Sequence, residues 1–134
     1  MNKLKETRGE FSLNGSLILL LVFACLALAI SVLGVANRSM KLHTMASELM
    51  RYTEVRGQVD SAVYGELDRL KDVTGMDANC TITANYLSGT TKVQFGEPIT
   101  VCLEYPVRFG IGGVLSVPMT LRATVAGRSE LYWK

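Results

Sequence analysis

The sequence LILLLVFACLALAISVLGVA, residues 17–36, decides the architecture of this chain. It holds 20 residues without a charge, and only Ser31 and Gly34 interrupt its apolar surface. At ~1.5 Å of rise per residue, such a helix spans ~30 Å, which is the thickness of a bilayer core. A buried soluble helix is disfavoured because nothing else in the chain could cover a helix that is apolar on every side. We therefore predict a transmembrane helix over residues 10–37.

A cleaved secretory signal peptide is the alternative interpretation of this segment. Its apolar region would normally hold ~7–15 residues and would be followed by a small-residue cleavage site. The uncharged stretch here is longer, from Phe11 to Asn37, and a helical pattern continues beyond it. These two features favour a permanent membrane helix.

Basic residues on the two sides of the span predict its orientation. Three precede the span and two follow it: Lys3, Lys5, Arg8, Arg38 and Lys41. The positive-inside rule then favours a cytoplasmic N-terminus. Residues 1–9 form a leader-like cytoplasmic tail that is too short to fold. We expect a single-pass protein of the cell membrane whose C-terminal head is extracellular.

Residues 38–75 show the period of an α-helix. Apolar side chains recur at intervals of three or four residues: Leu42, Met45, Leu49, Tyr52, Val55, Val59, Val63, Leu67 and Leu70. This is the stripe of an amphipathic helix whose other face is charged. The membrane helix should therefore continue to about Arg56. Gly57 and Gly65 are points where it could bend or break, and Thr74-Gly75 is typical of a helix end.

From residue 76 to residue 134 the apolar period changes to two, which is typical of strands with one buried face. The pattern predicts strands over residues 80–86, 93–95, 99–105 and 117–125, and residues 131–134 either extend or return along the last strand. The apolar face of this sheet needs a cover, and the stripe on residues 42–70 is the candidate. We predict an α+β fold in which a long N-terminal transmembrane helix continues into an amphipathic helix packed on a small antiparallel β-meander.

The cysteines leave a disulfide open but do not favour one. Cys80 and Cys102 both lie in the extracellular head, where a disulfide could form. Cys80 shares a strand face with Ile82, however, whereas the neighbours of Cys102 on its face are polar. Residues on opposite faces of a sheet cannot pair without a bulge. Cys25, inside the span, is expected to be a small apolar residue.

No group of residues predicts catalysis or cofactor binding. The chain has one histidine, His43, on the helix next to the membrane, and no CxxC spacing, so we expect neither a catalytic triad nor a zinc site. A net charge of +2 does not favour nucleic acid as a partner. We expect a protein that is not an enzyme, with no cofactor, no metal and no small-molecule substrate.

The N-terminal residues carry a resemblance to a known class. Basic residues, then Gly9, then an uncharged apolar helix resemble the N-terminus of a type IV prepilin. The resemblance implies that a membrane prepilin peptidase cuts after Gly9 and leaves Glu10 as the first mature residue. Type IV pilins usually carry a glutamate at the fifth mature position, where it is thought to pair with a neighbour's terminal amine. Asn14 stands there in this chain, and an amide cannot neutralise that amine.

The rest of the chain resembles an uncharacterised Gram-positive family, often carried on conjugative elements beside genes similar to the tight-adherence (Tad) secretion machinery. The matching segments are Arg8-Gly9-Glu10, residues 45–49 (MASEL), residues 118–123 (PMTLRA) and the terminal GRSELYWK, residues 127–134. Members of this family look like TadE-type minor pilins. The resemblance implies a membrane subunit that assembles with other pilin-like subunits or with itself.

Two functions remain open at this point. The first is a pilin-like or minor-pilin subunit of a Tad or type IV-like pilus, secretion or conjugation apparatus, with a structural role through helix packing. The second is a membrane-anchored scaffold or binding module of a conjugation complex that is never cleaved. Tyr132 and Trp133 at the end of the chain are either a contact surface or part of the core.

Overall fold

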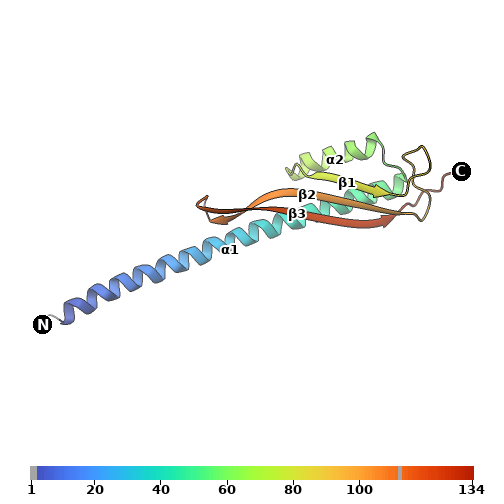
Figure 1. Cartoon of the computed structure of the whole chain (residues 1–134). Helices are drawn as coiled ribbons and strands as arrows, with labels where there is room; N and C mark the ends of the chain where they lie inside the picture. Colours follow the sequence, from blue (N-terminus) through green and yellow to red (C-terminus); the bar gives the residue numbers. More distant parts are fainter. Residues whose placement is uncertain (1–2, 112) are drawn as a thin grey trace.

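Helix α1 (Lys3–Arg56) is one continuous helix of 54 residues, as Figure 1 shows. The computed structural model describes residues 3–111 and 113–134, with side chains from Ser12 onward. At ~1.5 Å per residue the helix is ~80 Å long. Its first half stands free of the rest of the chain, and its second half lies along the head. The predicted continuation of the apolar helix to Arg56 is therefore confirmed, and residues 3–9 belong to the same helix.

Helix α1 ends at a glycine, as predicted. Gly57 adopts a φ of 60°, a left-handed conformation that stops the helix. Helix α2 (Ser61–Thr74) follows after Asp60, whose carboxylate caps its first turn, and Gly75 ends it with a φ of 68°. Gly65 lies inside α2 without breaking it, because one glycine costs only about 1 kcal/mol against the packing of the helix.

Three antiparallel strands form the sheet: β1 (Asn79–Ala84), β2 (Pro98–Ile111) and β3 (Leu115–Arg128). Their spatial order is β1-β2-β3, so the sheet is a meander. In the register, Cys80 lies opposite Leu103 and Cys102 opposite Thr81. The two cysteines therefore occupy opposite faces of the sheet, and both are free. The α+β class and the antiparallel meander are confirmed.

One face of the sheet packs against both helices. The α1 and α2 members of this core are Leu42, Met45, Ala46, Leu49, Met50, Val63, Leu67 and Leu70. They meet a row of fully buried residues at the centre of β2, namely Ile99, Val101 and Leu103. The predicted helical stripe therefore covers the apolar face of the sheet. One member is wrong: Val55 is 59% exposed, and Thr53 is buried in its place.

The strands differ from the predicted ones at two places. The short strand over residues 93–95 is wrong, because Val93 forms only an isolated bridge with Tyr86 and Phe95 is 61% exposed. Residues 131–134 form no strand either and pack across the end of α1. By contrast, β2 and β3 are longer than predicted and form a hairpin that reaches back along α1 (Figure 1).

Candidate functional site: the apolar half of α1 and its junction with the head

The predicted processing and assembly positions all lie at the free end of α1. Gly9 and Glu10 are within the helix, and the side chain of Glu10 falls outside the described part of the chain. Asn14 is on the next turn and is exposed. Among the described residues, the buried core of the head begins at Leu42, far along α1 from Asn14.

The free half of α1 exposes apolar side chains on all sides. Its large residues are between 40% and 70% exposed: Leu13, Leu17, Ile18, Leu19, Leu20, Leu21, Val22, Phe23, Leu26, Leu28, Ile30, Val32 and Leu33. In the segment Ser12–Arg56, the most apolar stretch is not buried by the protein and is long enough to cross a membrane. The described part of the chain therefore does not bury this stretch as a core helix of the head, and an exposed apolar surface of this size is typical of a membrane or protein contact. The helix is fit to be a single-pass membrane anchor.

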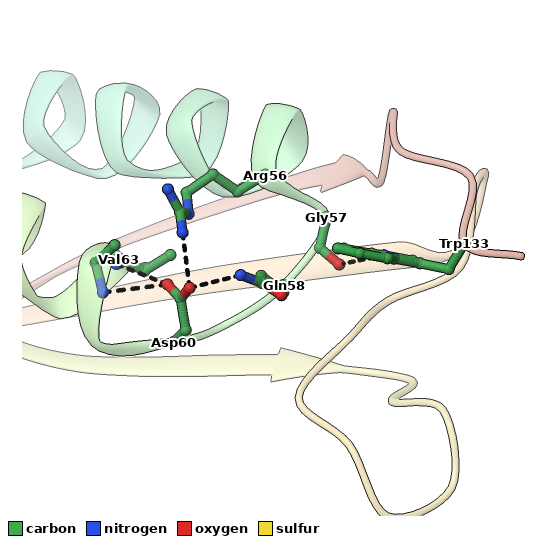
Figure 2. Close-up of polar contacts among 7 residues, drawn as sticks. Arg56, Gly57, Gln58, Asp60, Val63 and Trp133 are labelled. Atoms are coloured by element: carbon green, nitrogen blue, oxygen red, sulfur yellow. Dashed lines mark hydrogen bonds and ion pairs between the residues drawn. The ribbon is translucent and has the colours of Figure 1, made fainter.

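A network of polar contacts around Asp60 fixes the junction between α1 and α2 (Figure 2). One carboxylate oxygen accepts from the backbone amides of Ala62 and Val63, at 3.1 and 3.3 Å. The other accepts from the guanidinium of Arg56 at 2.7 Å and from the amide of Gln58 at 2.6 Å. The hydrogen bond from Arg56, more than any other contact, lowers the pKa of Asp60 below its usual value. The network therefore ties the last residue of α1 to the first turn of α2.

The C-terminal segment (residues 127–134) closes the head over the end of α1. The indole of Trp133 donates to the carbonyl oxygen of Gly57 at 3.0 Å, as Figure 2 shows. The backbone amide of Trp133 donates to Gln94, and the ammonium of Lys92 lies 4.1 Å from the centre of its ring. The buried hydroxyl of Ser129 donates to the carbonyl of Val93 at 2.9 Å. Trp133 is therefore a structural residue, whereas Tyr132 beside it is 65% exposed.

Two glycines allow this segment to approach α1 closely. A methyl group on Gly57 would come within 2.6 Å of the side chain of Leu131. One on Gly127 would come within 1.8 Å of the carboxylate of Glu54. Glu54 itself accepts from the backbone amide of Arg128 at 2.9 Å. The approach at Gly57 therefore depends on the absence of a side chain, whereas at Gly127 the flexible end of Glu54 would have to move.

The residues of this junction were not predicted from sequence as a group. Arg56 and Asp60 are four residues apart, whereas Trp133 is far from both in the chain, and each has an ordinary explanation when taken alone. Two signals were available: a glycine at the helix end and the terminal sequence GRSELYWK. Neither says that the two segments touch, because that contact joins residues 76 positions apart.

The head shows little that could support covalent chemistry. Burial raises the pKa of the Cys80 thiol to about 11, so at neutral pH it is protonated and a poor nucleophile. Among residues 12–111 and 113–134, no cluster of histidine, cysteine or carboxylate side chains could hold a metal ion. The geometry of the described residues is that of a structural junction and an exposed apolar helix.

The fold and the junction define a class of protein: a small α+β head held rigidly on one long apolar N-terminal helix. The chain belongs to the family described as Domain of unknown function (DUF4320), whose model matches residues 17–134. The match includes most of the apolar half of α1, the junction and the C-terminal segment. No curated protein and no solved structure matches the chain.

Proposed function

We propose that this chain is a pilin-like membrane subunit of a Tad or type IV-like pilus, secretion or conjugation apparatus. The observation that carries the proposal is α1: one helix whose apolar first half is bare and whose second half is the spine of the head. A bare apolar helix can lie in lipid or pack against the same helix of neighbouring subunits. Its role is then structural, with the membrane and other pilin-like subunits as partners and no catalytic step.

The rigid junction supports this role. Contacts from Asp60 and Trp133 bind α2 and the C-terminal segment to the end of α1. These contacts hold the head at the end of α1, as expected of a subunit that assembles through this helix. The predicted topology places the N-terminus in the cytoplasm and the head outside the cell.

A second candidate is an uncleaved membrane-anchored scaffold of a conjugation complex. Asn14 favours it, because an exposed amide at this position cannot form the ion pair that the pilin resemblance implies. This reading requires the helix only as an anchor. The two candidates differ in whether a peptidase removes residues 1–9.

The intact mass and N-terminal sequence of the protein from its native membrane test the proposal. We expect a chain that starts at Glu10 and lacks the nine residues before it. A Gly9→Val variant should keep those residues, because the branched side chain blocks the peptidase at the cleaved bond. Gly15→Ala is the matched control, since Gly15 has open space around it, and it should be processed like the wild type.

A wild-type chain that begins at Met1 would contradict the processing step. Its mass would then differ from that of the Gly9→Val variant only by the difference between the two side chains. The uncleaved scaffold would then be the better account. A chain that is processed even with valine at position 9 would show that another peptidase acts, and the pilin resemblance would lose its support.

A further inference from the structure

The hairpin of β2 and β3 runs past the head and along the apolar half of α1 (Figure 1). The hydroxyl of Ser31 donates to the carbonyl oxygen of Gly110 at 2.8 Å. Ser31 lies inside the uncharged run 17–36, five residues before its end. Ala24, Ala27, Ser31 and Val35 are the half-buried residues of this run. The far end of the hairpin therefore lies beside the part of α1 that is expected in the membrane.

This end of the hairpin is apolar and uncovered. No charged residue occurs between Arg108 and Arg122. Val114 is 88% exposed, Leu115 70%, Val117 62% and Met119 45%. Leu115, Val117 and Met119 continue the strand face that is buried at Ala123. That face of β3 continues beyond the core of the head. There α1 is the only helix beside the hairpin in the described structure, and it is too narrow to cover both β2 and β3.

Basic residues bound this apolar end on the side of the head. Arg108 and Arg122 flank it on the strands, and both are exposed. Arg122 is ion-paired with Glu104 on β2 and lines the same hollow as Ser39 and Thr44 of α1, which places it near Arg38 and Lys41. Arg108 lies opposite Pro118 and therefore nearer the end of the hairpin than Arg122. Basic side chains beside an apolar span are typical of the headgroup region, where they meet lipid phosphates.

We propose that the end of the hairpin, residues 109–111 and 113–121, lies in the interfacial layer of the membrane that α1 crosses, on the side of the head. The occupant of the apolar surface is lipid. The hairpin then serves as a second membrane contact that sets the height and tilt of the head above the bilayer. This inference uses the membrane anchor alone and is independent of processing or assembly.

The open edges of the strands set the depth of this contact. β1 pairs with β2 only as far as Glu104, and within the described sheet β3 pairs on one side only. Unpaired backbone groups are not tolerated in the hydrocarbon core, but water and headgroups satisfy them at the interface. The uncharged part of α1, Phe11 to Asn37, is 27 residues and therefore ~40 Å long. It exceeds the ~30 Å core by about the thickness of an interfacial layer.

Tryptophan fluorescence of the full chain in phosphatidylcholine vesicles tests the contact. A Val114→Trp variant places an indole at the exposed end of the hairpin, and brominated acyl chains quench indoles that they touch. Leu115→Trp is a second variant for the same site. Ser88→Trp is the matched control, because Ser88 is exposed in the loop after β1, at the other end of the head. Phe23→Trp reports the membrane helix itself. The native Trp133 contributes the same background to all variants.

The expected result is a loss of the added emission in Val114→Trp and Leu115→Trp, larger with bromine near the headgroup than with bromine near the chain ends. Phe23→Trp should be quenched and Ser88→Trp should not. The proposal is overturned if the hairpin variants behave like Ser88→Trp while Phe23→Trp is quenched. The proposal is also overturned if the emission of the hairpin variants shifts to the blue only when the protein-to-lipid ratio is raised. Such a dependence would mean that a second copy of the chain, and not lipid, covers the apolar surface. An unquenched Phe23→Trp would remove the anchor and with it the contact, without bearing on N-terminal processing.

Discussion

At the scale of single residues, Asp60 makes the most contacts at the junction. Its carboxylate accepts two backbone hydrogen bonds from the first turn of α2 and two from side chains, one of them charged. Hydrogen bonds to the ionised form stabilise that form and lower the pKa, in the direction found here. Folding is then favoured by the ionised carboxylate.

Replacing Asp60 by alanine should lower the free energy of unfolding of the head by about 1 kcal/mol, the usual cost of a lost N-cap. Asp60→Asn keeps an oxygen for the cap and should cost less. Because the pKa of Asp60 is lower in the folded protein, the ionised carboxylate stabilises the fold at pH values above the ordinary carboxyl pKa. This stabilisation is lost as the pH falls through the pKa of the folded state. Acid should therefore destabilise the wild type more than Asp60→Asn. Urea unfolding in detergent micelles at pH 7 and at acid pH, followed by Trp133 emission, measures both. An equal acid response in the two proteins would contradict the role of Asp60.

Cys80 should be protected from alkylation by its environment. Its pKa of about 11, against 9.0 for an ordinary thiol, leaves ~100-fold less thiolate at pH 8, and only the thiolate reacts quickly. Treatment of the full chain with iodoacetamide in micelles, followed by mass spectrometry of peptides, should show slow modification of Cys80. In urea the rate at the same residue should rise about 100-fold by the same argument. Equal rates with and without urea would show that burial does not control this thiol.

At the scale of elements, the C-terminal segment decides how the head joins α1. It carries Trp133 to the carbonyl of Gly57 and Ser129 to that of Val93. Through these contacts an irregular segment replaces the predicted final strand. It adds a second donor to the Gly57 carbonyl, which also accepts from the backbone amide of Val93, and it supplies a donor to the carbonyl of Val93 in the loop.

Gly57→Ala should destabilise the head more than Gly75→Ala. Both glycines have a positive φ, which costs an L-residue about 1–2 kcal/mol. Only Gly57 also faces a close contact, with the side chain of Leu131, so its variant should lose about 1–3 kcal/mol more. Thermal unfolding in micelles, followed by circular dichroism, compares the two. Equal losses would mean that the C-terminal segment moves aside without cost.

At the scale of the whole molecule, α1 connects two environments. Its C-terminal half is buried from Leu42 to Thr53 along one face, and its N-terminal half is bare. The head is thereby fixed to a helix that can lie in lipid or in a helical assembly, and the Gly9→Val experiment distinguishes a processed subunit from a permanent anchor. The hairpin experiment concerns the same molecule before any assembly, when the apolar ends of β2 and β3 face the bilayer.

Much of this architecture is local in origin and was predictable. The span, the break at Gly57 and the cap at Gly75 each depend on a few neighbouring residues. The faces of Cys80 and Cys102 follow from the period of two along a strand. The strand over residues 93–95 was wrong because Val93 is buried by loop contacts with Gly57 and Ser129, not by a ladder. Of the candidate site, Gly9, Glu10 and Asn14 were named from sequence, and their role stays a prediction.

The apolar helix, the amphipathic stripe after it and the alternating strands could all be predicted from the order of residues, because each depends on the hydrophobic period of a short stretch. The contact of Trp133 with Gly57 and the extension of the β2–β3 hairpin beside Ser31 could be seen only in the folded molecule. Those contacts join residues that are distant in the chain or depend on how far a hairpin overhangs its core. Contacts between distant residues and the overhang of the hairpin both depend on how the elements pack in three dimensions. The order of polar and apolar residues along the chain does not specify that packing.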